Sequence, residues 1–149
     1  MGLDMYLYAK RYLSQYNEND KKIESGVSLM FPELSANKIP VKEVSAEVGY
    51  WRKANQIHGW FVKNVQEGVD DCKPYYVSSE QLQELRALCQ SVIDNPSLAE
   101  QLLPCMTGFF FGGTGYGEWY INDLKQTVEI IDHALELADD WDFWYQSSW

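Results

Sequence analysis

The sequence predicts an α+β domain in which a small, mainly antiparallel sheet is covered by about three helices. Short segments that alternate apolar and polar residues indicate half-buried strands. Longer segments between them repeat their apolar residues with the period of a helix. No repeat or linker divides the 149 residues, a length that suits one domain. We therefore expect a single globular domain over 1–149, with strands near 3–12, 43–50, 108–112 and 141–147 and helices over 52–66, 79–94 and 118–138.

The N-terminal third is expected to form two strands joined by a long connection. Apolar residues occupy the odd positions of 3–12, as in a strand with one buried face. Residues 14–25 are polar and charged, which predicts a loop. Two prolines disfavour long regular elements in 31–42. Alternation then resumes over 43–50, which predicts the second strand.

The central helices follow from their apolar faces and their ends. The helix over 52–66 has one apolar side, and His58 lies in the middle of it. The helix over 79–94 has a clear start, because Ser78 and Gln81 have the spacing of a capping box. An Asn-Pro pair directly after this second helix predicts its end.

The C-terminal third combines an apolar run, a glycine-rich loop, a helix and an aromatic tail. Three consecutive phenylalanines predict a short buried strand near 108–112. Four glycines follow before the helix expected over 118–138. The tail over 141–147 alternates aromatic and polar residues, so we expect it to be a packed strand.

The charge of the chain is unevenly distributed. The sequence has 22 acidic and 12 basic residues, a net charge of −10. Residues 94–149 contain ten acids and a single base, Lys125. Direct binding of a phosphate backbone needs a basic face and is therefore not expected. The charge instead permits an acidic surface that attracts a basic partner.

The sequence gives no indication of a membrane span or a signal peptide, since no apolar run approaches the roughly 18–20 residues of a span. Hydrophobic residues make up 46% of the chain, as in a globular protein. Cys72, Cys89 and Cys105 form no CxxC pair, and no metal set is recognisable. We expect a cytoplasmic protein with reduced thiols and without a metal or cofactor.

The glycine-rich loop is a candidate ligand site. An apolar run, four glycines and a helix start resemble a phosphate cradle. Glu118 and Trp119, however, stand where a phosphate-binding loop has Lys followed by Ser or Thr. Two explanations are open: a turn that needs glycine for its backbone conformation, or a ligand-binding loop. The residues assigned to the second explanation are Gly112, Gly113, Gly115, Gly117, Arg52 and His58.

His58 also has two explanations. It is a general base if an acid such as Glu47 or Asp70 lies beside it. It is otherwise a hydrogen-bonded residue of the core. No nucleophile motif accompanies it, so we assign no catalytic residue.

The aromatic content, 15% of the chain, admits both packing and binding roles. Tyr6 and Tyr8 share one face of the first strand. Trp60 falls on the polar side of its helix, which predicts an exposed side chain available to a partner. Core and rim packing is the alternative for these residues.

The last helix combines an apolar face with a stripe of carboxylates. Carboxylates along one side of a helix lie at intervals comparable to those of nucleic-acid phosphates. Such a helix could act as a DNA mimic and compete with nucleic acid for the basic groove of a partner. The alternative is a solvated face that keeps the protein soluble. The residues assigned to partner binding are Glu118, Trp119, Glu129, Asp132, Glu136, Asp139, Asp140, Asp142, Trp144 and Trp60.

Several segments resemble a family of small, functionally uncharacterised phage and prophage proteins. They are MGLDMYLYAKRY, VGYWRKANQIHGWFVKNVQEGVDDC, GFFFG…EWY and the terminal FWYQSSW. The resemblance extends over nearly the whole chain. It implies a protein made in the host cytoplasm, and such proteins are often inhibitors of host machinery or immunity.

Three functions follow as hypotheses. The first is a non-enzymatic inhibitor, similar in action to anti-CRISPR or anti-restriction proteins, that binds a host defence or nucleic-acid-handling protein through its acidic, aromatic C-terminal surface. The second is a binder of a small molecule such as a nucleotide signal, or a minor nucleotide-processing enzyme, that uses the Gly112–Gly117 loop. The third is a phage assembly component. A homodimer is compatible with each.

Overall fold

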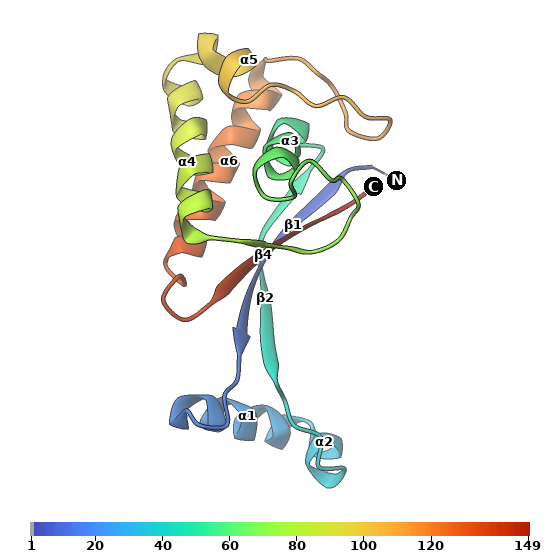
Figure 1. Ribbon diagram of the computed structural model, residues 1–149, viewed down its shortest axis with the longest axis vertical. Coiled ribbons are helices and arrows are strands. Elements are labelled where there is room, and N and C mark those ends of the chain that lie inside the picture. The colour runs from blue at the N-terminus through green and yellow to red at the C-terminus, as the bar shows by residue number, and fades with distance from the viewer. Residues whose placement is uncertain (1) are drawn as a thin grey trace.

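A computed structural model describes residues 2–149 of the chain (Figure 1). Within these residues, four strands form one antiparallel sheet in the order β2-β1-β4-β3. The predicted α+β class with an antiparallel sheet is confirmed. The strands are β1 (Asp4–Tyr12), β2 (Glu43–Arg52), β3 (Tyr75–Val77) and β4 (Asp142–Ser148).

The described residues contain six α-helices and one short 3-10 helix, more than the three expected. The predicted helix over 79–94 is confirmed with both its ends, and its capping box between Ser78 and Gln81 is present. The two other long helices are present but shorter than predicted. The helices are α1 (Glu18–Met30), α2 (Pro32–Ala36), α3 (Asn55–Asn64), α4 (Ser79–Asp94), the 3-10 helix η1 (Pro96–Leu98), α5 (Ala99–Leu102) and α6 (Glu118–Leu135).

The core lies between one face of the sheet and the long helices. Met5, Leu7 and Ala9, the first three odd residues of β1, are fully buried on this face. Helix α6 joins the sheet through Trp51, whose Nε1 donates to Thr127 Oγ1 at 2.9 Å. Phe61 of α3 stacks on Tyr145 of β4 with ring centroids 3.8 Å apart. Figure 1 shows α4 and α6 side by side in this part of the molecule, which we call the body.

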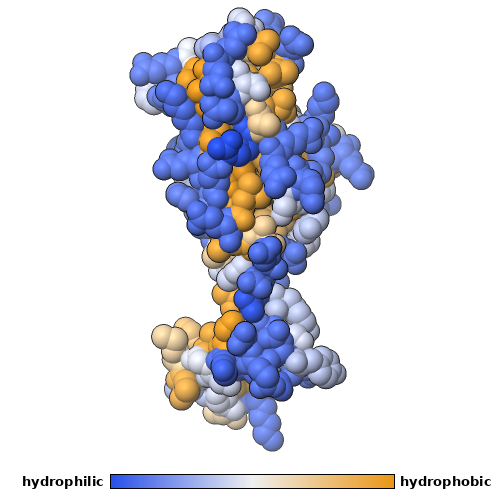
Figure 2. All heavy atoms as spheres, turned by 90° about the vertical axis from the view of Figure 1, so that its left-hand side faces the viewer, coloured by the Kyte–Doolittle hydropathy of each residue, from blue (hydrophilic) through white to orange (hydrophobic). Residues whose placement is uncertain are grey.

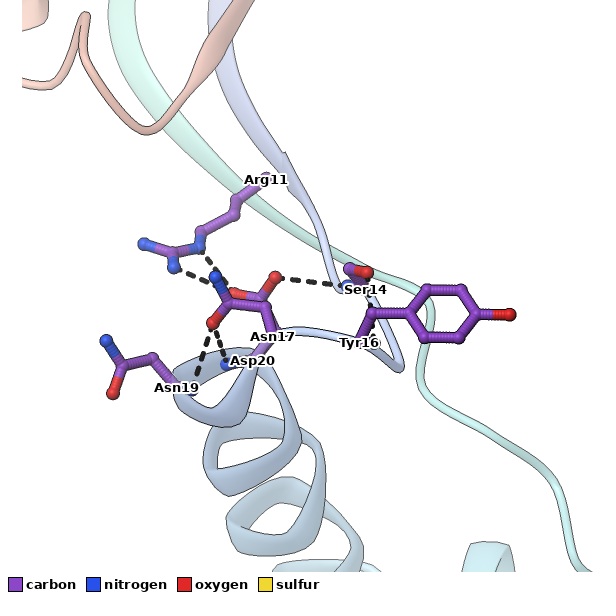
Figure 3. A network of polar contacts seen from close by, with 6 residues as sticks. All are labelled: Arg11, Ser14, Tyr16, Asn17, Asn19 and Asp20. Carbon is purple, nitrogen blue, oxygen red and sulfur yellow. Dashed lines mark hydrogen bonds and ion pairs between the residues drawn. The ribbon is translucent and has the colours of Figure 1, made fainter.

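Residues 13–42 form a separate lobe at the end of the β1–β2 hairpin (Figure 1). The loop predicted over 14–25 is wrong, because helix α1 begins at Glu18. The helix has a side-chain cap: Asn17 Oδ1 accepts from the backbone N–H groups of Asn19 and Asp20 at 2.9 and 3.1 Å (Figure 3).

An ion pair fixes the lobe to the end of β1. Arg11 donates to Asp20 Oδ1 from Nη2 at 2.8 Å and from Nε at 3.1 Å. The other carboxylate oxygen accepts from the Ser14 backbone N–H at 3.1 Å (Figure 3). The Arg11 guanidinium is the main reason that the pKa of Asp20 lies below its ordinary value. These contacts set the direction in which α1 leaves the hairpin.

Two further predictions of strands need correction. Residues 108–112 form turns instead of a strand, because Phe111 N–H bonds to Gly108 O at 3.2 Å and Gly112 has a φ of +87°. Strand β3 was not predicted, since three residues are too few to show alternation. Strand β2 extends two residues beyond the predicted 43–50.

Gly49 is required by packing between β2 and α6. A Cβ at this buried position would collide with the side chain of Ile130. We therefore expect Gly49→Ala to lower the free energy of unfolding by about 1–3 kcal/mol through overpacking. Gly26 is the matched control: its Cβ would meet no atom within 4 Å, and it lies inside α1. Gly26→Ala should leave the free energy of unfolding unchanged or raise it slightly, as measured by urea denaturation. If Gly49→Ala and Gly26→Ala lower the free energy of unfolding equally, the packing argument is contradicted.

Candidate functional site

A cleft of about 520 Å³ lies where the end of β2, the start of α3, the segment 105–117 and the start of α6 meet. We call it the glycine-loop cleft. Five of the six residues predicted to bind a ligand line it, and they come from two distant parts of the chain. The lining residues are Arg52, Lys53, Asn55, Gln56, Cys105, Gly112, Gly113, Gly115, Gly117, Trp119, Tyr120 and Asp123.

Asn55 holds the glycine-rich segment in place. This side chain is almost fully buried, at 2% exposure. Its Nδ2 donates to the carbonyl oxygens of Phe111 at 3.1 Å and Gly113 at 2.8 Å. Its Oδ1 accepts from the backbone N–H of Met106 at 2.9 Å. The Asn55 side-chain amide therefore connects the start of α3 both to Met106 and to the glycine-rich residues 111–113. Both its nitrogen and its oxygen take part in these hydrogen bonds.

The glycines of the loop have different roles. Gly112 has a positive φ of +87°, and a Cβ there would lie 3.2 Å from the Cβ of Lys53. This position therefore needs glycine for the fold. A Cβ at Gly113, Gly115 or Gly117 would meet no atom within 4 Å. These three leave open space in the cleft, so the turn explanation holds for Gly112 and not for the others.

Positive charge enters the cleft from Arg52 and Lys53. Both residues are exposed, and no ion pair joins either of them to a carboxylate among residues 2–149. Helices α3 and α6 also begin at the cleft, and neither N-terminus has a side-chain cap. At the start of α3 the N–H groups of Asn55 and Ile57 already donate to the carbonyl oxygens of Lys53 and Ala54. The start of α6 and the two free cations are therefore the groups that an anion would use for binding. Glu118, in the first turn of α6, opposes part of this positive potential.

Asp123 adds a carboxyl group to the same cleft. It lies one turn into α6 and is only partly exposed. Gln56 Nε2 donates to its Oδ2 at 3.2 Å. Burial raises the pKa of Asp123 above its ordinary value, although the Gln56 hydrogen bond acts in the opposite direction. Such a group accepts hydrogen bonds from a ligand that supplies N–H or O–H donors.

Cys105 lines the cleft but is not an activated nucleophile. Burial raises the pKa of its thiol above the ordinary value. Its backbone N–H donates to the Tyr116 hydroxyl at 3.2 Å. The side chain therefore contributes a neutral thiol to the wall of the cleft.

Trp60 is not the exposed anchor that the sequence predicts. It is 6% exposed and lies in the hydrophobic core. The amphipathic pattern of α3 is misleading here, because α4 and the segment 101–106 lie along its polar side, where the three elements line a second cavity of about 450 Å³. Trp60 lines that cavity and is not available to project toward a partner.

His58 is a buried member of a hydrogen-bonded chain. Its Nε2 lies 3.0 Å from Asp70 Oδ2, and its Nδ1 lies 2.7 Å from the Tyr145 hydroxyl. Because a carboxylate only accepts, we assign the proton to Nε2, and Nδ1 accepts from Tyr145. Asp70 Oδ1 also accepts from the indole N–H of Trp149 at 3.1 Å. The expectation of a hydrogen-bonded core histidine is confirmed.

The groups of this hydrogen-bonded network resemble those of a catalytic triad, but only Asp70 is partly exposed. His58 and Tyr145 are both fully buried, so no substrate reaches either group. Burial is the main reason that the pKa of His58 is below its ordinary value. Phe111, at the base of the glycine loop, packs edge-on against His58 with centroids 5.2 Å apart. His58 therefore supports the loop from behind and does not line the cleft.

The acidic stripe of α6 is exposed, but it is interrupted. Arg86 of α4 forms a bidentate ion pair with Asp132, in which Nη2 donates to Oδ2 at 3.0 Å. The guanidinium lowers the pKa of Asp132. The remaining acids of the set are exposed and have no ion pair within the described residues. They are Glu118, Glu129, Glu136, Asp139, Asp140 and Asp142.

The aromatic residues assigned to partner binding do not lie together. Trp119 is 86% exposed at the first turn of α6, at the opposite end of the helix from Asp139 and Asp140. Trp144 lies across from Tyr8 on the sheet face that points away from α6, where Lys10 Nζ is 5.5 Å from its ring centroid. The predicted partner-binding residues therefore occupy three separate regions, with Trp60 buried.

Sequence reasoning missed Asn55, Gln56 and Asp123. Asn55 had no visible role, because its partners are backbone groups more than fifty residues away. A signal did exist for Asp123. It is three residues after Tyr120 and four before Thr127, both buried, so a helical wheel places this carboxylate on the buried side of α6.

Comparison with known proteins gives no match to a family model, a curated protein or a solved structure. No helix in the described part of the chain is long and apolar enough to cross a membrane. The same residues contain no group of three or more His, Cys, Asp or Glu side chains arranged to hold a metal ion.

Proposed function

We propose that the protein binds a small organic anion of the nucleotide class in the glycine-loop cleft. One observation supports this most directly: two unpaired cations, a partly buried carboxyl and open glycine backbone meet in one cleft of about 520 Å³. That volume is within the range of ligand sites, about 300–1,000 Å³. The sequence hypothesis of a nucleotide-signal binder is thus favoured over the inhibitor hypothesis, whose residues are dispersed.

The anionic part of the ligand is assigned to the cationic side of the cleft. Arg52 and Lys53 follow each other at the end of β2, and Gly112 packs on the Lys53 stem. A phosphate between them gains charge-assisted hydrogen bonds. The uncapped start of α6 offers further N–H donors.

The uncharged part of the ligand is assigned to Asp123 and Trp119. A nucleobase presents N–H donors along one edge and a flat face. The Asp123 carboxyl accepts from such donors, and the exposed Trp119 ring offers a stacking surface at the lip of the cleft. A simple inorganic phosphate would use only the cationic side and should bind more weakly.

We propose binding without chemical conversion. The His58 chain is buried away from the cleft, and Cys105 is held as a neutral thiol. A protein that holds a nucleotide in this manner lowers its free concentration, which is the action of a sponge for a nucleotide signal.

Isothermal titration calorimetry with linear and cyclic nucleotides, and with inorganic phosphate as reference, tests the proposal. We expect at least one nucleotide of this panel to bind. Arg52→Ala should weaken its affinity about tenfold or more, because one charge-assisted hydrogen bond is lost. Lys125→Ala, which removes an exposed cation outside the cleft, is the matched control. Gly113→Leu fills open space in the cleft without backbone strain and should abolish binding. Absence of heat across the whole panel would overturn the proposal.

A second candidate function is the binding of a basic partner protein through the acidic side of α6. The exposed acids Glu129 and Glu136, which have no cationic partner in the described residues, favour a basic partner protein such as a host defence or nucleic-acid-handling factor. Reversal of Glu129 and Glu136 to Lys should abolish capture of that partner from host lysate, with Asp132 left unchanged because it holds Arg86 of α4. Capture that survives this reversal and high salt would exclude the acidic helix as the contact surface.

A further inference from the structure

The lobe formed by residues 13–42 has apolar side chains that nothing in the described chain covers. Leu29 and Met30, at the end of α1, are 81% and 79% exposed. Phe31, between α1 and α2, and Ile39, after α2, are each 51% exposed. Figure 2 shows apolar atoms on the lobe, below the narrow neck that separates it from the body. Adjacent large apolar residues at such exposure indicate a contact surface.

The lobe is also poorly supplied with a core of its own. Within residues 13–42, Leu13 is the one buried apolar side chain, and Asp20 is the one buried polar residue. Helices α1 and α2 pack mainly against each other, at the far end of the hairpin from the body. Burial of the exposed apolar residues would therefore add to the stability of the lobe.

Charge distinguishes the lobe from the rest of the chain. Residues 13–42 contain four acids and four bases, so their net charge is zero, and the net charge of −10 belongs entirely to the other residues. Two bodies of this charge repel each other at short range. Two lobes do not, so the lobe is the part of the molecule through which a second copy approaches without net repulsion.

We propose that the protein forms a two-fold symmetric dimer in which the lobes of two copies pack against each other through Leu29, Met30 and Phe31. These adjacent apolar residues would form the buried centre of the interface, and the polar residues of the lobe around them would form its rim. A hollow of about 540 Å³ beside Leu29, lined by Ser25, Ser28 and Pro32, gives space for a large side chain of the other copy. The hairpin arms keep the two acidic bodies apart and leave both clefts open.

The oligomeric state of the full chain tests the proposal. Light scattering after size-exclusion chromatography should give twice the chain mass for the natural sequence. The double variant Leu29→Glu and Phe31→Glu should give the mass of a single chain, because both carboxylates would be buried in the interface. Trp119→Glu is the matched control, since it changes an equally exposed apolar residue of the body and should leave the dimer intact.

Salt and a second variant complete the test. A dimer held by apolar contact between neutral lobes should persist at high salt. A dimer formed through the acidic bodies would appear only at high salt, where the repulsion between them is screened. If the Glu variant unfolds α1, Leu29→Ser with Phe31→Ser removes apolar surface without added charge and should still weaken the dimer at least tenfold. A monomer at all accessible concentrations, or a dimer that both double variants leave unchanged, would overturn the proposal.

Discussion

Asn55→Asp should lower the free energy of unfolding by about 2–4 kcal/mol and abolish ligand binding in the glycine-loop cleft. The substitution keeps the shape of the side chain and the acceptor for Met106 N–H. It replaces the Nδ2 donor by a carboxylate oxygen that faces the carbonyl oxygens of Phe111 and Gly113. Two hydrogen bonds become repulsive contacts at a buried position. Urea denaturation and calorimetry measure the two effects.

Asn64→Asp provides the control at the other end of α3. Asn64 is exposed, and its Nδ2 donates to the carbonyl oxygen of Trp60 at 2.9 Å within the same helix. The same chemical change there should cost less than about 1 kcal/mol, because water solvates the new carboxylate. If both substitutions cost the same, Asn55 does not hold the loop in the manner described.

The second large effect concerns pH. The pKa of His58 is lowered by burial in the folded state, below the value of about 6.5 expected in the unfolded chain. Above about pH 6.5, His58 is neutral in both the folded and the unfolded protein, so its protonation does not reduce the free energy of unfolding. As pH falls through it, the unfolded state takes up a proton that folded His58 resists, so the free energy of unfolding decreases. The slope for one proton is at most about 1.4 kcal/mol per pH unit.

His58→Gln separates this effect from those of the carboxylates. Glutamine retains a donor toward Asp70 and does not titrate, so the loss of stability as the pH falls from about 6.5 to 5 should disappear. The overall stability should be lower, because the Tyr145 hydroxyl loses its acceptor. Asp20 and Asp132, whose pKa values are lowered by arginines, lose their contribution only in more acidic solution. An unchanged slope in the variant would show that another group causes the loss of stability.

Much of the body was predictable because its signals are local. The capping box of Ser78 and Gln81 determines where α4 begins, and alternation identifies β1 and β4. Strong short-range patterns of this kind do not depend on what packs against them. The lobe was missed because the apolar residues of α1 are few among charges, and its helix depends on the cap at Asn17 and the Asp20 ion pair.

The candidate site was partly predictable for a similar reason. The glycines belong to a recognisable loop pattern, and the structure brings them into one cleft with Arg52. Asn55 and Asp123 act through contacts between distant segments, which a single sequence does not display. The prediction for Trp60 was wrong because α4 and the segment before Cys105 cover the polar side of α3.

The strand order also has a consequence for how the chain assembles. The hairpin of β1 and β2 can form early, but β4 lies between β1 and β3 and pairs Ser148 with Asp4. Until β4 arrives, one edge of β1 and the whole of β3 have no partner. Contacts between residues so far apart in sequence make folding slow in comparison with helical proteins. During that interval the open edge of β1 is the place where association between incomplete chains should begin.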